Sequence, residues 1–92
     1  MNIEDLFFVN LNTICPTQYE VRLEDGTKVG YVKHRGQVVE CHPYKDGEID
    51  VKRTLVLQEY VEYLDDDLMV KCGKALCDFY NKKEFLAFFN NC

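Results

Sequence analysis

The chain carries both its longest helical apolar pattern and its densest charge in residues 57–80, LQEYVEYLDDDLMVKCGKALCDFY. At ~100° of rotation per residue, one set of apolar side chains would share a helix face: Leu57, Tyr60, Val61, Leu64 and Leu68. Glu59, Glu62 and Asp66 would gather on the opposite face. A later apolar set is rotated away from the first: Cys72, Ala75, Leu76 and Phe79. The pattern indicates a helix with one packed face and one charged face. It also indicates a break between the first apolar set and the second.

The break between the two apolar sets falls at three consecutive aspartates, Asp65, Asp66 and Asp67. Carboxylates accept from the unpaired amides at a helix start and favour the positive end of its dipole. We therefore expect two helices, over residues 58–64 and 67–80, with one unbroken helix over residues 57–80 as the alternative.

Four upstream segments show the period of two that is typical of strands: residues 19–24, 28–33, 38–41 and 48–57. Turn signals separate them at Asp25-Gly26, at residues 34–37 and at residues 45–47. Pro43 must end the third strand or place it at an edge. Short turns between successive strands favour an antiparallel meander.

The two ends of the chain complete the expected architecture. Residues 3–8 predict a short helix with Asn2 as its cap, and residues 9–17 predict a loop. After Asn81, one more amphipathic helix contains four large apolar residues: Phe85, Leu86, Phe88 and Phe89. We expect this helix to cover the sheet. If other helices already cover it, the same residues would leave an apolar patch that needs a partner or a second copy of the chain.

We therefore expect an α+β fold in one domain, residues 1–92: an antiparallel β-meander of about four strands, with a short N-terminal helix and two to three C-terminal helices packed on one face. The predicted core consists of apolar positions from these elements: Val21, Leu23, Val29, Tyr31, Val39, Ile49, Val51, Leu57, Val61, Leu64, Leu68, Cys72, Leu76 and Phe79.

The net charge of −5 argues against direct binding of nucleic acid, which is driven by cations that displace counterions. The acidity is local, because residues 55–70 hold five acids and no base. The N-terminal sequence MNIEDLFFV has no basic segment or cleavage site of a secretory signal, and no segment is long enough to span a membrane. Five cysteines without a regular framework favour reduced thiols, so we expect a cytoplasmic protein.

Cysteine and histidine supply one possible chemistry, a zinc site or a thiol-dependent enzyme or sensor built from Cys41, His42, Cys72 and Cys77. Their spacing argues against it. Cys72 and Cys77 would point about 140° apart on a helix, and adjacent Cys41 and His42 would point to opposite faces of a strand. We expect buried free cysteines, no metal, no cofactor and no catalysis.

The acidic helix face is the remaining functional signal. Its residues are Glu59, Glu62, Asp65, Asp66 and Asp67, with Tyr60 and Tyr63 interleaved. Carboxylates three or four positions apart on a helix lie about 5–6 Å apart and would present a row of negative charge to a basic groove. The tyrosines would act as amphipathic anchors. The alternative is a solvated face that only keeps the protein soluble.

In size, acidity and expected architecture, the chain resembles some phage-encoded inhibitors of host defence, including anti-CRISPR proteins that occupy the nucleic-acid groove of a nuclease. The resemblance involves no aligned residues and transfers no site. It implies a protein–protein interaction module that inhibits its partner by blocking a basic, nucleic-acid-binding surface. We expect the chain to be a monomer or a homodimer through its aromatic C-terminal helix.

Overall fold

The computed structural model describes residues 1–12, 16–45, 48–49 and 55–90. A short 3₁₀ turn, six strands and one long α-helix follow one another: η1 (Ile3–Asp5), β1 (Phe7–Asn12), β2 (Thr17–Arg22), β3 (Lys28–Arg35), β4 (Val38–Lys45), β5 (Glu48–Ile49), β6 (Leu57–Tyr60) and α1 (Asp66–Asn90). The fold is α+β, as the sequence predicted.

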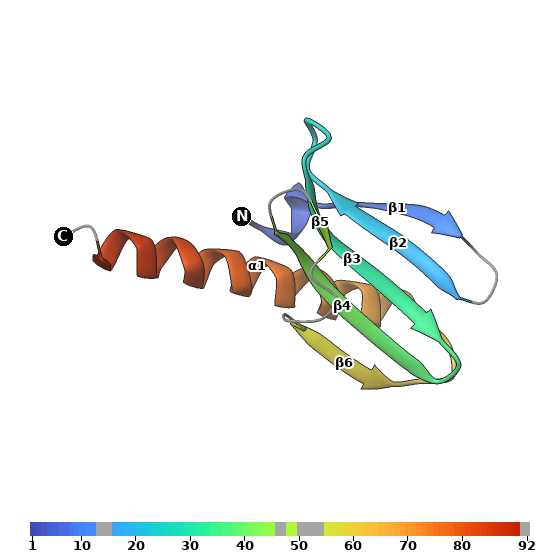
Figure 1. The fold of residues 1–92 in the computed structure, drawn as a ribbon. Helices are drawn as coiled ribbons and strands as arrows, with labels where there is room; N and C mark the ends of the chain where they lie inside the picture. The colour runs from blue at the N-terminus through green and yellow to red at the C-terminus, as the bar shows by residue number, and fades with distance from the viewer. Residues whose placement is uncertain (13–15, 46–47, 50–54, 91–92) are drawn as a thin grey trace.

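Five of the strands form one antiparallel sheet (Figure 1). Strands β1 to β4 are neighbours in chain order, and β6 pairs with β4 along its other edge. The two-residue strand β5 pairs with the end of β4, where Tyr44 lies opposite Ile49. The first three predicted strands, residues 19–24, 28–33 and 38–41, are therefore confirmed as β2, β3 and β4. The predicted fourth strand, residues 48–57, is wrong for residues 55 and 56, which are not in a strand, and its residues 50–54 lie outside the described residues. Strand β1 and most of β6 were not predicted.

Two turns of the meander require glycine. Gly26 has a φ of 89° and Gly36 a φ of 61°, in the left-handed region where a side chain is strained. At the first turn the Asp25 side chain also accepts the Thr27 amide at 2.9 Å. Both turns lie where the sequence predicted them.

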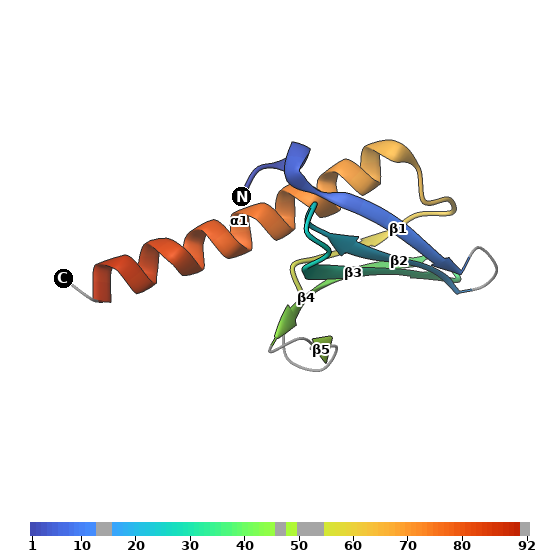
Figure 2. The ribbon, with the colours of Figure 1, turned by 90° about the horizontal axis from the view of Figure 1, so that it is seen from above.

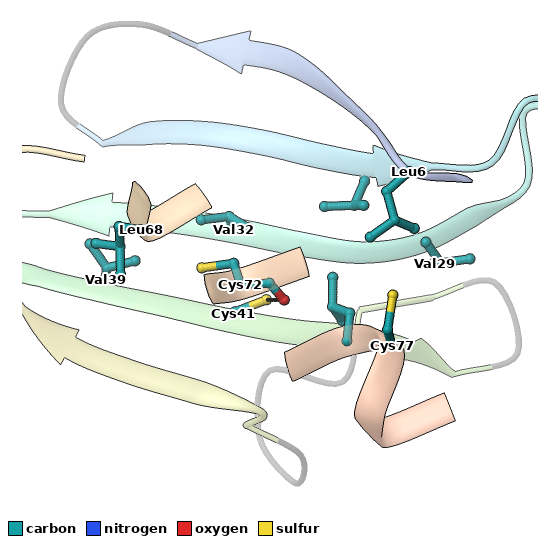
Figure 3. Close-up of a cluster of buried hydrophobic side chains, with 10 residues drawn as sticks. Leu6, Val29, Val32, Val39, Cys41, Leu68, Cys72 and Cys77 are labelled. Carbon is teal, nitrogen blue, oxygen red and sulfur yellow. Dashed lines mark hydrogen bonds between the residues drawn. The ribbon is translucent and has the colours of Figure 1, made fainter. Parts of the chain in front are cut away.

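Helix α1 crosses one face of the sheet (Figures 1 and 2). The hydrophobic core lies between the helix and this face. The buried apolar residues from both layers form one cluster: Leu6, Val21, Val29, Val32, Val39, Cys41, Leu68, Cys72, Leu76 and Cys77. Figure 3 shows the side chains of α1 beside those of β3 and β4 in this cluster. Among the described residues, no helix lies on the opposite face of the sheet in either view.

Gly30 of β3 allows the helix to approach the sheet closely. A Cβ atom at this position would lie 2.5 Å from Leu76 Cδ1 and 2.9 Å from Leu76 Cδ2. Leu76 is fully buried, so it has little room to move away. The missing side chain of Gly30 therefore sets the depth at which α1 packs.

The N-terminal residues pack on the same helix. Ile3, Phe8 and Leu6 would be the nearest neighbours of a side chain at Gly73 in α1. The Asn81 side chain of α1 donates to the Met1 carbonyl at 3.1 Å and accepts from the Met1 amino group at 3.1 Å. Gly73 thus permits close packing against the N-terminal segment.

The predicted N-terminal helix over residues 3–8 is wrong. The predicted loop over residues 9–17 is wrong for residues 9–12 and 17, which lie in strands, and its residues 13–15 lie outside the described residues. A single 3₁₀ turn, Ile3–Asp5, is followed at once by strand β1. Phe8 pairs with Val21 and Asn10 with Tyr19, so β2 has a partner strand on both sides. This pairing satisfies the backbone groups of residues 7–12 that face β2, which a surface loop would leave to water.

The prediction of two to three C-terminal helices is also wrong for the described residues. Residues 57–60 form β6, which pairs with Val38–Cys41 of β4. The helix begins at Asp66, and the Asp65 carboxylate accepts the Leu68 amide at 2.8 Å. From there α1 continues without a break to Asn90, and its C-terminal half extends beyond the sheet in both views (Figures 1 and 2). The expected start at the aspartates agrees with the structure.

Most predicted core residues are buried or half-buried, Tyr31 among them, but the predicted set is incomplete. Tyr31 is buried on the other face of the sheet, outside the main cluster. Four buried residues were absent from the predicted core: Leu6, Val32, Cys41 and Cys77. The side chains of Ile49 and Val51 lie outside the described residues.

We expect Gly30→Ala to lower the free energy of unfolding by about 1–3 kcal/mol, because the new methyl group overlaps Leu76. Leu76→Ala should cost about 2–5 kcal/mol by itself. Because removing the Leu76 side chain opens space for the new methyl group, the double variant should be less destabilised than the two changes added together. Urea unfolding of the four proteins measures this coupling. Additive effects would contradict the proposed contact.

Candidate interaction surfaces

The sequence-predicted site residues lie in and around one connection, between β6 and α1. Six of the seven predicted residues are exposed to solvent there: Tyr60, Glu62, Tyr63, Asp65, Asp66 and Asp67. We call these six residues the acidic turn. The predicted row of carboxylates on a helix over residues 58–64 is wrong, because that segment is a strand followed by a turn.

Glu59 does not belong to the acidic turn. It pairs with Val39 in the sheet and faces the helix, where its Oε1 lies 3.6 Å from Lys71 Nζ. Tyr60, its neighbour, points to the other face because side chains alternate along a strand. The strand therefore separates two residues that the helical pattern had placed on one surface.

The tyrosines of the acidic turn are the most exposed large hydrophobic residues described in the chain. Tyr60 is 76% exposed and Tyr63 is 75% exposed. Between and after them, Glu62, Asp66 and Asp67 form no ion pair with any described residue. The surface thus combines unpaired negative charge with two aromatic rings.

Hydrogen bonds hold the acidic turn against the β3–β4 turn. The Val61 amide donates to the Gln37 carbonyl at 2.8 Å. His34 Nε2 lies 3.1 Å from the Val61 carbonyl. At its other end the turn joins α1 through the Asp65 cap. Asp66 and Asp67 lie in the first helical turn, where their charge also favours the helix dipole. The carboxylates of Asp65, Asp66 and Asp67 therefore also stabilise the first turn of α1.

The four residues of the alternative thiol or zinc hypothesis do not form one cluster. Cys41, Cys72 and Cys77 are free and buried, and Cys41 Sγ lies 3.8 Å from the Cys72 carbonyl oxygen. A hydrogen bond with Cys72 and burial raise the pKa of the Cys41 thiol, a hydrogen bond with Cys41 lowers the pKa of Cys72, and burial raises the pKa of Cys77. The raised pKa values disfavour the reactive thiolate at Cys41 and Cys77. His42 lies on the other face of the sheet from Cys41, bonded to Glu40.

No group of three His, Cys, Asp or Glu side chains that could hold a metal occurs within the described residues. Cys15 and Cys92 lie outside those residues. The prediction of buried free cysteines is confirmed for Cys41, Cys72 and Cys77.

The helix-free face of the sheet is a second polar surface, and sequence reasoning did not single it out. Cross-strand pairing brings Glu20, Tyr31 and His42 into one row, with Gln18, Lys33 and Glu40 in the next. A hollow of about 420 Å³ lies over this face. Its lining residues are Pro16, Gln18, Tyr31, Lys33, Arg35, Glu40 and His42.

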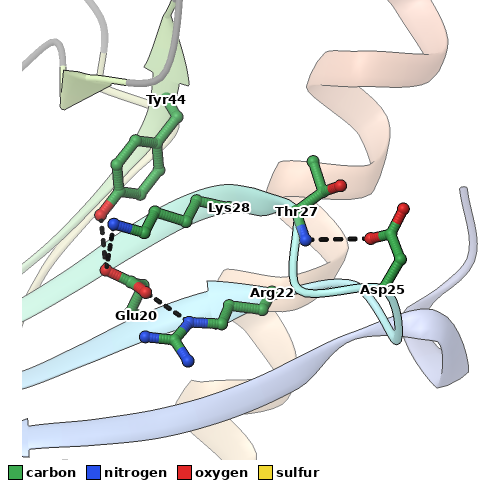
Figure 4. A network of polar contacts seen from close by, with 6 residues as sticks. All are labelled: Glu20, Arg22, Asp25, Thr27, Lys28 and Tyr44. Carbon is green, nitrogen blue, oxygen red and sulfur yellow. Dashed lines mark hydrogen bonds and ion pairs between the residues drawn. The ribbon is translucent and has the colours of Figure 1, made fainter.

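A buried carboxylate organises one end of this face. Figure 4 shows Arg22, Lys28 and Tyr44 converging on Glu20. Arg22 forms an ion pair with Glu20, the Tyr44 hydroxyl donates to Glu20 at 3.0 Å, and Lys28 Nζ lies 3.8 Å away. Burial acts to raise the pKa of Glu20, but these contacts outweigh it and lower that pKa. Burial and the bond to Glu20 raise the pKa of Tyr44 to about 12.

A hollow of about 630 Å³ lies at the N-terminal end of the fold. Three apolar residues and four carboxylates line it: Met1, Phe7, Leu23, Glu4, Asp5, Glu24 and Asp25. Two of these carboxylates already accept local backbone amides, Asp5 from Asn2 and Asp25 from Thr27. These two carboxylates therefore stabilise local turns of the chain.

No family model, curated protein or solved structure matches the chain. Within the described residues, no helix is long and apolar enough to cross a lipid bilayer. Function must therefore be inferred from the surfaces of the chain itself.

We expect acid to destabilise the fold partly through Glu20. Because its pKa is lowered from the ordinary value of 4.5, its contribution is complete above about pH 4.5 and is lost as the pH falls below that value. Glu20→Gln should cost about 1–3 kcal/mol at pH 7 and flatten the dependence of stability on pH between about pH 5 and 3. Thermal unfolding across that range measures both effects. The matched control is Glu24→Gln, an exposed carboxylate on the same hairpin, and an equal effect there would contradict the role of Glu20.

Proposed function

We propose that the chain is a protein–protein interaction module that binds a basic surface of its partner through the acidic turn. The observation that carries the proposal is the joint exposure of Tyr60 and Tyr63 beside carboxylates without ion-pair partners in the described structure. Aromatic side chains of this kind supply most of the energy in many interfaces.

Charge and rigidity both support this use of the acidic turn. A negative patch steers a basic partner toward it and raises the association rate. The bonds of Val61 to Gln37 and His34 hold the middle of the turn in place before a partner arrives. Less conformational entropy is then lost on binding.

We further propose that binding inhibits the partner. A basic groove that accepts these carboxylates is of the kind that binds nucleic-acid phosphates, so the two ligands would compete. The resemblance in size, acidity and fold class to phage-encoded inhibitors of host defence supports a nucleic-acid-binding nuclease as the target, as in anti-CRISPR proteins. The module has no catalytic role in this proposal.

Three changes test the interface without touching the helix cap. We expect Tyr60→Ala and Tyr63→Ala each to weaken partner binding at least about tenfold through the loss of an aromatic anchor. Glu62→Lys should slow association and reduce its salt dependence. The measurement is capture from a bacterial lysate at low and high salt, followed by binding kinetics with the purified partner.

Matched controls are Phe7→Ala, an exposed aromatic on β1, and Asp78→Lys, an exposed acid further along α1. Both should bind as the unchanged chain does. Competition with nucleic acid for the captured partner then tests inhibition. A partner that binds the three variants normally would refute the acidic turn as interface, and one that binds chain and nucleic acid together would refute inhibition.

The C-terminal half of α1 supports self-association as a second prediction. Its sequence contains Phe85, Leu86 and Phe89 at helical spacing, and its backbone extends beyond the sheet. We expect a homodimer in solution that Phe85→Asp combined with Phe89→Asp converts to a monomer. Light scattering after size exclusion measures the mass, and Lys82→Asp is the control. A monomeric unchanged chain would contradict the prediction.

A further inference from the structure

We propose that the hollow on the helix-free face of the sheet, distinct from the acidic turn, is a binding site for a small phosphate monoester. Tyr31 and His42, which pair across β3 and β4, are buried and form its floor. Gln18, Lys33 and Arg35 surround the floor with donor groups, and Pro16 adds an apolar wall.

The cations of this face divide into two groups. At one end, Arg22 and Lys28 share the carboxylate of Glu20. At the hollow, Lys33 and Arg35 form no ion pair with any described residue. Glu40, the carboxylate in the lining, lies 3.2 Å from His42 Nε2 instead. The hollow therefore carries two cations, Lys33 and Arg35, against the single carboxylate of Glu40, which gives it a local excess of positive charge on a chain whose net charge is −5.

Two cations that flank one small hollow match a dianion better than a single carboxylate. A phosphate monoester carries between one and a half and two negative charges near neutral pH. Its oxygens accept bidentate bonds from the planar Arg35 group, while Lys33 acts as a mobile point charge. Gln18 and the Tyr31 hydroxyl offer neutral donors to the remaining oxygens.

The shape also fits a small molecule. The hollow has a volume of about 420 Å³, and a smaller one of about 270 Å³ adjoins it, sharing Lys33, Arg35 and Glu40. Pockets of roughly 300–1,000 Å³ are typical for small ligands. Stacking of a nucleic-acid base on the floor is disfavoured because Tyr31 is only 8% exposed. The site therefore favours a compact anion.

The test is an amide NMR titration of the whole chain at constant ionic strength with adenosine monophosphate, inorganic phosphate and adenosine. We expect saturable shifts at Gln18, Lys33 and Arg35 with the two phosphates and none with adenosine. Tighter binding of the monophosphate indicates an ester ligand. Equal affinity for inorganic phosphate would indicate a free-phosphate site and overturn the ester.

Single variants then test whether Lys33 and Arg35 bind the anion. Lys33→Gln and Arg35→Gln should each weaken binding at least about tenfold, while Arg35→Lys should retain part of the affinity. Lys74→Gln, an exposed lysine on α1, is the control and should bind normally. Shifts that do not saturate, or that are equal at Lys74, would mean nonspecific anion association and refute the site. Unchanged affinity in both glutamine variants would refute it as well.

Discussion

The close packing of Leu76 on Gly30 is the contact on which the rest of the structure depends. It brings α1 onto one face of the sheet, so that Cys72 and Leu68 join Cys41 and Val39 in one buried cluster. Because side chains alternate along each strand, covering one face leaves the other to polar residues. The Asp65 cap sets where α1 begins, next to the acidic turn. Both candidate interaction surfaces are consequences of a single helix occupying a single face.

The sequence was sufficient for the central strands and insufficient for the outer ones. The alternation of Tyr19, Val21 and Leu23 with charged residues identified β2, and Gly26 located its turn. Residues 7–12, FFVNLN, begin with three apolar residues and alternate only over their last four positions, so the strand pattern was short and β1 was missed. LQEY at 57–60 fits a helix and a strand equally well. Tertiary pairing decided it, since backbone bonds to β4 outweigh a weak local preference.

For the candidate surfaces too, the residues were visible in the sequence but their arrangement was not. Composition located the carboxylates and tyrosines of the acidic turn, but not that Glu59 would face Lys71 while Tyr60 faces away. The hollow beside Lys33 and Arg35 depends on three strands in a specific register. The alternation of these cations was visible in the sequence, yet their lack of ion pairs becomes apparent only once Glu40 is placed against His42.

The place of α1 after all six strands has a consequence for biosynthesis. As the chain leaves the ribosome, β1 to β6 emerge before the helix that covers their apolar face. Val21, Val32 and Val39 therefore stay open to water until Leu68 and Leu76 have been translated. The meander itself can form early because its contacts are local. A nascent sheet with one bare apolar face is prone to aggregation, so efficient folding depends on rapid docking of the last element or on a chaperone that shields that face.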